Sequence, residues 1–384
     1  MAKKAVEADS NDATTNPNVV VEEKRKIVKK EFSLSDYKNK KGLNDEVKDK
    51  PLDFIPMSKA YVEATGMAVP IGFVSIVAGY SSVGKSTMVM EAIVGSQKKG
   101  ILPVIIDLEN NFSFERAKLM GMEFDEVFDE TTGELISYDG FFIYVNNDYI
   151  LKNFDKKRNP KLNEATIEGL AMMINTFLDE QEKGDLDVPL FFALDSVGVL
   201  DSEKSILGVR NNMFNAGSYE ANFKSILNYR IPASRKETRK HTNTLLAVNK
   251  IWLDSMSGGA GTIKMKGGEC FFYSSRIITL LGNTLTHGTK KLYAQCTVNG
   301  EKKSYQFGVQ VKIKMIKDHI NGNSFESEIV STAKGFISVD EIENYKRDNK
   351  KYILSKLEIS DTDIQLETVK EEDKTIIREE DYSE

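Results

Sequence analysis

Residues 73–94 decide the fold and read FVSIVAGYSSVGKSTMVMEAIV. An apolar run comes first, a short turn follows, and an amphipathic run ends the stretch, which predicts a strand, a loop and a helix. The loop has the spacing G-x-x-x-x-G-K-S, formed by Gly79, Gly84, Lys85 and Ser86. This spacing between a strand and a helix is typical of a loop that binds nucleotide phosphates. The alternative is a glycine-rich turn that contains a lysine by chance, and both flanking segments argue against it.

The residue types in this loop suit a bound phosphate. Gly79 and Gly84 can adopt backbone angles that point consecutive amides at an anion. The helix that follows directs the positive end of its dipole to the same place. Lys85 can reach the β- and γ-phosphates, and the Ser86 hydroxyl can ligate Mg²⁺. We therefore expect a nucleoside triphosphate and Mg²⁺ as cofactors.

Composition sets broad limits on the protein. The 384 residues are 40% hydrophobic, enough for a large core, and the two cysteines, Cys270 and Cys296, imply no disulfide framework. No run of eighteen apolar residues occurs, so we expect a cytoplasmic protein without a membrane segment. The net charge of −6 is concentrated in residues 361–384, which hold ten Asp/Glu and three Lys/Arg. Without this tail the chain is close to neutral, so composition does not exclude a nucleic-acid partner.

The chain divides into three parts by composition. Residues 1–50 are polar and lysine-rich, and we expect a solvated arm, or one that docks on a neighbouring subunit, with a short basic helix at 22–32. Residues 51–340 are expected to form the folded core. Residues 341–384 contain a lysine-rich helix, expected at 341–357, and an acidic tail that lacks the apolar surface to fold alone.

Apolar runs and helical periodicities alternate through the core. Strands are expected at 103–109, 141–145, 189–194 and 244–248, and helices at 114–120, 164–181 and 219–229. This alternation predicts an α/β fold with a mostly parallel, twisted sheet and helices on both faces. An antiparallel meander is expected after it, from strands at 276–281, 292–297, 304–307, 309–316 and 326–331.

Polar residues stand at the ends of three of the core strands. They are Asp107 and Glu109, then Asp195, then Asn249 and Lys250. The carboxyl ends of parallel strands meet at one edge of a sheet, where the phosphate loop also lies, so we expect these side chains to lie together. Asp195 can hold Mg²⁺, directly or through water, although an Asp after a strand can instead cap a helix.

Two polar segments are expected to be loops. Residues 201–217 are rich in polar side chains. Residues 254–268 contain five glycines, which disfavours a helix or a packed strand, so we expect a mobile loop that carries Lys264 and Lys266. The basic cluster at 230–240 between them is most often a solvated connection in a chain of this kind.

Taken together, the order of these pieces resembles the RecA family of DNA strand-exchange ATPases, most closely the UvsX-type recombinases of tailed phages. The similarity runs from about Asp53 to Asp340 and includes IPM at 55–57 and TGMAVPIGFVSIVAG at 65–79. The phosphate loop alone would not distinguish this family, whereas the joint pattern does. The resemblance implies a RecA-like P-loop NTPase core, followed by a C-terminal antiparallel meander, with flexible tails.

The resemblance also implies roles for individual residues of the nucleotide site. Glu109 matches the glutamate that activates the attacking water, and its place after a buried strand independently suits a general base. Asp107 is expected to support the local backbone. Lys250 stands where relatives have Gln or His, and lysine has no acceptor with which to sense a water. ATP and Mg²⁺ are expected to contact Gly79, Tyr80, Ser81, Ser82, Val83, Gly84, Lys85, Ser86, Thr87 and, as metal ligands, Ser86 and Asp195.

Other implied residues face the nucleotide from elsewhere. Arg116 takes the place of a tyrosine that stacks on adenine. Lys317 matches a basic residue that reaches the ATP of the adjacent subunit, as an arginine finger does, and His319 replaces a second one. Without the resemblance, Lys317 would be an outward-facing lysine on a strand. Phe272 matches an aromatic residue that enters a neighbouring subunit, with a plain core phenylalanine as the alternative.

The two polar segments match the DNA-binding loops of the family, at about 201–217 and 252–268. Glycine amides and lysines suit phosphate contacts, and an apolar side chain could wedge between bases. The alternative for the second segment is a surface insertion without a ligand, and the cluster at 230–240 is a weaker DNA candidate. The DNA-binding residues implied are Arg210, Gly258, Gly259, Gly261, Ile263, Lys264, Met265 and Lys266.

The resemblance therefore implies an ATP-dependent recombinase that forms a helical filament on single-stranded DNA and exchanges strands with a homologous duplex. Expected partners are a single-strand-binding protein and a loader, and the compartment would be the host-cell cytoplasm if a phage encodes the chain. The acidic tail is expected to compete with DNA for basic surface. Two alternatives stay open, a hexameric helicase on the same core and an ATP-gated scaffold that binds DNA without useful turnover.

Overall fold

The computed structural model describes residues 33–43, 48–209, 215–254, 262–265, 269–282, 288–360 and 364–372. The chain separates into two units, residues 1–45 and 46–384. In the first unit, helix α1 (Leu34–Lys40) begins after Ser33, whose hydroxyl accepts a hydrogen bond from the Asp36 amide at 3.3 Å. The basic helix predicted at 22–32 lies outside the described residues.

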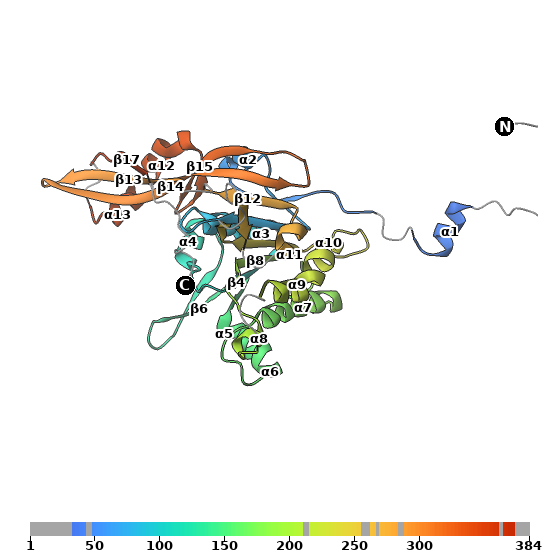
Figure 1. Cartoon of the computed structure of the whole chain (residues 1–384). Helices are drawn as coiled ribbons and strands as arrows, with labels where there is room; N and C mark the ends of the chain where they lie inside the picture. Colours follow the sequence, from blue (N-terminus) through green and yellow to red (C-terminus); the bar gives the residue numbers. More distant parts are fainter. Residues whose placement is uncertain are drawn as a thin grey trace, which may run out of the picture. The chain divides into compact units, whose positions relative to one another are not determined.

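The second unit is built on an eleven-stranded sheet, and one half of it is parallel (Figure 1). The central strands of this parallel half are wholly buried, because apolar side chains project from both of their faces and helices flank them. This arrangement confirms an α/β fold with a large parallel sheet. In spatial order the parallel strands are β12 (Ile277–Leu281), β3 (Val74–Gly79), β9 (Thr244–Asn249), β8 (Leu190–Val197), β4 (Leu102–Asp107) and β7 (Ile143–Asn146).

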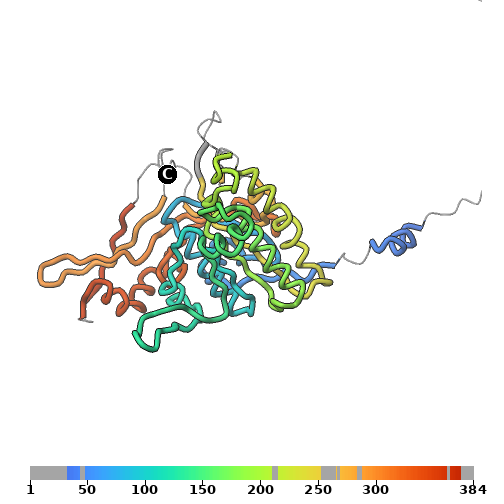
Figure 2. The backbone as a smooth tube through the Cα atoms, turned by 90° about the horizontal axis from the view of Figure 1, so that it is seen from below, coloured from blue at the N-terminus to red at the C-terminus, as the bar shows by residue number. Residues whose placement is uncertain are grey.

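The other half of the sheet is antiparallel and continues from β12. Figure 2 shows the long ribbon of β13 and β14, in orange, extending beyond the parallel strands. Two strands were expected at 304–307 and 309–316, but they form one strand, and Gly308 stays paired on both sides, with Leu292 and Thr332. The strands are β14 (Glu301–Asp318), β15 (Glu326–Thr332), β16 (Gly335–Ile337), β13 (Thr289–Val298) and β17 (Glu367–Glu372).

Helices pack against the parallel strands. α3 (Lys85–Lys98) packs on four of these strands, β3, β4, β8 and β9. α7 (Ile167–Lys183) packs against α9 (Asn215–Ser225), which continues through the π-helical turn η3 (Ile226–Arg230) into α10 (Ile231–Ala233) (Figure 1). The other helices of the core are α2 (Lys59–Thr65), α4 (Phe114–Leu119), α5 (Asn147–Ile150), η1 (Leu151–Asp155), α6 (Lys156–Arg158), α8 (Glu203–Ile206) and α11 (Glu269–Ser274).

Two small strand pairs complete the core. β1 (Phe54–Ile55) pairs with β2 (Val69–Pro70) beside the start of β3. β5 (Asp125–Phe128) and β6 (Leu135–Asp139) form a hairpin around a turn at residues 129–133, where the Gly133 amide donates to the Asp129 carbonyl oxygen at 2.9 Å. Most buried apolar side chains belong to one cluster that includes the parallel strands and α3.

The C-terminal part differs from the expectation in two ways. The single helix predicted at 341–357 is broken at Asn349, whose backbone is not helical, so a short 3₁₀ turn η5 (Val339–Glu341), α12 (Ile342–Asp348) and α13 (Lys350–Lys356) replace it. Tyr345 and Ile353 are buried in a second apolar cluster beneath the antiparallel strands, and the break lets both helices reach it. Part of the acidic tail also pairs as β17 with β13.

Among the described residues, no helix is both long enough and apolar enough to cross a membrane.

Candidate nucleotide site

The strand, loop and helix predicted from the sequence are all present, as β3, the loop that follows it, and α3. The backbone takes positive φ angles at Gly79 (154°), Ser82 (60°) and Gly84 (97°), and α3 begins at Lys85. A side chain at Gly79 would collide with the carbonyl oxygen of Leu281 in the neighbouring strand β12. The glycine therefore lets the loop leave the sheet close to β12, with the amino end of a fourteen-residue helix directly behind it.

The strand ends gather at this edge of the sheet, as the sequence predicts. Asp107 of β4 lies opposite Asp195 of β8, and Ala78 of β3 lies opposite Asn249 of β9. Asp195 and Ser196 lie inside β8, which runs further than the apolar stretch that predicted it. The register brings the carboxylates level with the loop without a connection between them in sequence.

Lys85 is buried within the loop that it follows. Its side chain is 8% exposed, and its ammonium donates a hydrogen bond to the carbonyl oxygen of Tyr80. Burial lowers the pKa of Lys85 to about 8, although the nearby carboxylates of Asp195 and Glu109 oppose this change. The ammonium is therefore held in low-dielectric surroundings, where it would interact strongly with a phosphate.

Asp195 is tuned in the opposite direction. Burial and the negative charge of Glu109 raise the pKa of Asp195 to about 6. Asp195 and Ser86 line one cavity together with Asp107. A hydroxyl and a buried carboxylate are hard oxygen ligands of the type that Mg²⁺ takes, so these residues fit the metal expected there.

Glu109 is held by two neighbours on the same oxygen atom. Its Oε1 accepts a hydrogen bond from the Ser196 hydroxyl and lies 3.2 Å from the ammonium of Lys250. Burial alone would raise the pKa of Glu109, but Ser196 and Lys250 together bring it below its usual value. The carboxyl group is therefore ionised near neutral pH, as a general base requires.

Asp107 has a different task from Glu109. Its carboxylate accepts hydrogen bonds from the amides of Asn111 (3.1 Å) and Phe112 (2.9 Å), and from the Tyr144 hydroxyl (2.9 Å). It thus fixes the chain that follows Glu109, in agreement with the backbone role expected for it. Sequence reasoning missed Ser196 and Tyr144, because neither residue is near its partner in the chain.

Arg116 lies against the start of α3. Its guanidinium donates hydrogen bonds to the hydroxyl of Thr87 and to the carbonyl oxygen of Thr332 (3.1 Å). The Thr87 hydroxyl is also 2.6 Å from that of Ser331. These contacts connect α4, α3 and β15, and they place Arg116 beside the first turn of α3. Stacking on adenine stays a prediction.

Lys317 and His319 do not join the nucleotide site of their own chain. Lys317 pairs with Ile278, which pairs with Ile76, so it lies three positions before Gly79, roughly 10 Å along the strand. Its ammonium donates hydrogen bonds to the carbonyl oxygens of Phe272 (2.6 Å) and Tyr273 (3.1 Å). The Phe272 side chain is 38% exposed, so it is not a plain core residue. The His319 amide binds the Arg276 carbonyl oxygen at 2.9 Å.

The second predicted DNA segment is not a loop throughout. β10 (Ile251–Asp254) pairs with β11 (Thr262–Met265) in an antiparallel hairpin that includes Ile263 and Lys264, so the expectation of no strand there was wrong. The glycines explain the error, because three lie between the two strands and two lie after them. Met265 packs partly against the main core. Gly258, Gly259, Gly261, Lys266 and Arg210 lie outside the described residues.

Within the first predicted DNA segment, residues 203–206 form the short helix α8, where a loop was expected. Ser202 starts this helix, because its hydroxyl accepts the Ser205 amide at 3.3 Å. A polar stretch of this composition supports a capped helical turn as readily as a loop.

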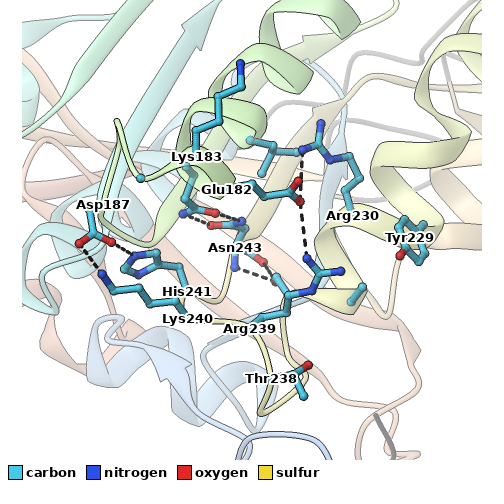
Figure 3. Close-up of a pocket in the computed structure, with 15 residues that line it drawn as sticks. Glu182, Lys183, Asp187, Tyr229, Arg230, Thr238, Arg239, Lys240, His241 and Asn243 are labelled. Atoms are coloured by element: carbon cyan, nitrogen blue, oxygen red, sulfur yellow. Dashed lines mark hydrogen bonds and ion pairs between the residues drawn. The ribbon is translucent and has the colours of Figure 1, made fainter. Parts of the chain in front are cut away.

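The basic cluster at 230–240 is engaged by acidic residues at the other edge of the sheet. Figure 3 shows the cavity of about 340 Å³ that it lines, next to the start of β9. Arg230 pairs with Asp179 at 2.7 Å, and Lys240 and His241 both contact Asp187. These charges are compensated within the chain, and the cavity lies at the opposite end of the parallel strands from the loop before α3, so it is separate from the candidate nucleotide site.

Comparison with known proteins gives a distant similarity. No family model matches the chain. Two curated proteins named Protein RecA, from two strains of Ureaplasma parvum serovar 3, are 31% identical to it over 81 residues. These residues are 21% of this chain and 24% of the relatives, so the chain spans about a quarter of the length of the proteins it matches. The chain is thus distantly similar to RecA, and its fold is compatible with a RecA-like core.

Proposed function

We propose that this protein is an ATP-dependent recombinase, which forms a helical filament on single-stranded DNA and catalyses homologous pairing and strand exchange. The observation that carries the proposal is the meeting of Lys85, Asp195 and Glu109 at one edge of the sheet, beside the loop before α3. The distant similarity to RecA supports the choice of a recombinase among the enzymes that use such a site.

The side chains then have separate tasks in hydrolysis. Bound ATP and Mg²⁺ would supply the electrophilic γ-phosphoryl group and neutralise part of its charge. Ser86 and Asp195 would hold the metal, and Lys85 would hold the phosphates. Glu109 would accept the proton of the attacking water on Oε2, because both of its contacts described above fall on Oε1.

Self-assembly supplies the remaining part of the proposed site. Lys317 and the phosphate loop lie toward opposite ends of the strip formed by β3, β12 and β14. A head-to-tail contact between copies could bring Lys317 of one chain to the loop of the next, and repetition of such a contact generates a helix. Single-stranded DNA and homologous duplex DNA are the proposed substrates, with a single-strand-binding protein and a loader as partners.

Substitution of the base tests this proposal. We expect Glu109→Gln to lower single-stranded-DNA-stimulated ATP hydrolysis by about 10² to 10⁴-fold, because glutamine cannot accept the proton, while ATP binding persists. Phosphate release and equilibrium binding of ATP measure the two effects. The matched control is Glu115→Gln in α4, which removes a solvent-exposed carboxylate from the same region and should leave hydrolysis unchanged.

Two results would contradict the proposal. One is wild-type protein that hydrolyses ATP at the same rate with and without single-stranded DNA. The other is a Glu109→Gln variant that hydrolyses ATP as fast as the control does.

A further inference from the structure

Lys250 occupies a fixed place between two buried residues. It joins β9 to β10, and its neighbours Asn249 and Ile251 are 0% and 1% exposed. The Lys250 side chain itself is 35% exposed. Packing therefore holds the backbone at this position. If Lys250 changes its partner, only its side chain has to move.

The ammonium groups of Lys85 and Lys250 both act on Glu109, but their side chains differ in how freely they can move. Lys85 is 8% exposed and donates to the carbonyl oxygen of Tyr80 in the loop. Lys250 lies 3.2 Å from Oε1 of Glu109, on a side chain that solvent reaches. Lys250 therefore carries the ammonium group that an incoming anion could draw away from Glu109.

The ion pair affects Glu109 as a base. An ammonium beside a carboxylate stabilises its charged form and lowers its affinity for a proton. The same oxygen also accepts the Ser196 hydroxyl, so the resting carboxylate is doubly held. Gln or His, expected at this position from the resemblance, would not place a full ammonium charge there at neutral pH.

The position of Lys250 along the chain suggests which anions compete with Glu109 for its ammonium group. β10 starts at the residue after Lys250 and leads into the glycine-rich segment proposed to bind DNA. The phosphate loop lies at the same edge of the sheet, since Asn249 pairs with Ala78. Phosphate oxygens from either DNA or nucleotide would therefore arrive near the ammonium.

We propose that Lys250 exchanges partners, from Glu109 in the resting chain to a phosphate oxyanion in the working complex, and so restrains the base until that phosphate is bound. This inference rests on the proposed function, because it assigns a regulation to the same site. It makes Lys250 a positioning residue that acts through Glu109.

A double-mutant cycle of unfolding tests the resting pair in the full chain. Lys250→Met, Glu109→Gln and the double variant are unfolded without ligand, then with a slowly hydrolysed ATP analogue, with a single-stranded oligonucleotide, and with both. Without ligand we expect a coupling of roughly three- to tenfold in the unfolding equilibrium constant. Loss of the coupling with the analogue alone identifies the nucleotide as the phosphate, and loss only when DNA is present identifies the DNA backbone.

ATP hydrolysis provides the functional readout. If DNA supplies the phosphate, Lys250→Met should lower the ratio of DNA-stimulated to DNA-free hydrolysis by roughly three- to tenfold, chiefly by raising the DNA-free rate. If the nucleotide supplies it, this ratio should stay unchanged. Lys59→Met is the matched control, because Lys59 forms an exposed ion pair within α2, and it should behave as the wild type does.

Three results would overturn the exchange: no coupling without ligand, coupling that survives both ligands, or a DNA-free rate that falls in Lys250→Met to the level of Glu109→Gln. Wild-type protein without any ATP hydrolysis would instead overturn the proposed function. The unfolding cycle needs no turnover, so the two failures can be told apart.

Discussion

At the scale of single residues, burial tunes two neighbouring charges in opposite directions. The pKa of Asp195 is raised to about 6 and that of Lys85 is lowered to about 8. Both shifts mean that the folded chain without ligand holds these charges at a cost in free energy. A bound metal ion and phosphate would offset that cost. The two charges therefore destabilise the protein without ligand more than they destabilise its complex.

Asp195→Asn should therefore stabilise the ligand-free protein. The pKa of Asp195 is higher in the folded than in the unfolded chain, so its contribution is favourable at low pH and is lost as pH rises through about 6. At pH 7.5 we expect the free energy of unfolding to increase by about 1–3 kcal/mol, and near pH 4 the gain should vanish. Denaturant unfolding at both pH values measures it. The exposed Asp185→Asn serves as the control, and an equal gain at both pH values would refute the explanation.

The sequence predicts part of this site well. Asp107, Glu109, Asp195 and Lys250 were expected at one edge because each follows an apolar run, and parallel strands align such ends. The hydrogen bond from Ser196 to Glu109 and the contacts of Arg116 depend on how separate strands and helices pack. No local pattern in the chain reports such contacts.

At the scale of elements, the backbone of α3 lies very close to the segment that follows β1. A side chain at Gly95 would collide with the carbonyl oxygen of Pro56, next to β1. Glu91 of the same helix accepts the amides of Ser58 (3.1 Å) and Phe336 (2.6 Å). α3 is thus tied to segments before and after it in the chain.

Alanine at two helical glycines should have opposite effects. Gly95→Ala should lower the free energy of unfolding by about 1–3 kcal/mol, because the packed backbone must move. Gly217 in α9 has nothing within 4 Å of the added carbon, so Gly217→Ala should raise stability by about 0.5–1 kcal/mol. Thermal unfolding of both variants measures the difference. Equal effects would show that the approach to Pro56 is not tight.

Element prediction succeeds where periodicity is strong and fails where pairing is distant. The buried strands and α7 follow from apolar runs and helical spacing. The β10–β11 hairpin was missed because glycines dominate the segment around its strands. β17 was missed because its acidic residues lack a strand pattern, and its pairing depends on the edge of β13, which lies far away in the chain.

At the scale of the whole molecule, the proposed site is incomplete in one chain. Lys317 contacts carbonyl oxygens of α11 and lies away from the loop before α3 in its own chain. The basic cluster at 230–240 is compensated by acids, so it is a weaker candidate for DNA than the segment after Lys250. We therefore expect ATP hydrolysis to require the assembly of several copies.

Electron microscopy of the assembly tests this requirement most directly. Wild-type protein is mixed with single-stranded DNA and a slowly hydrolysed ATP analogue, and the same mixture without nucleotide is the control. We predict helical filaments whose length follows that of the DNA, and few or none without nucleotide. Isolated particles or closed rings in the complete mixture would contradict the account.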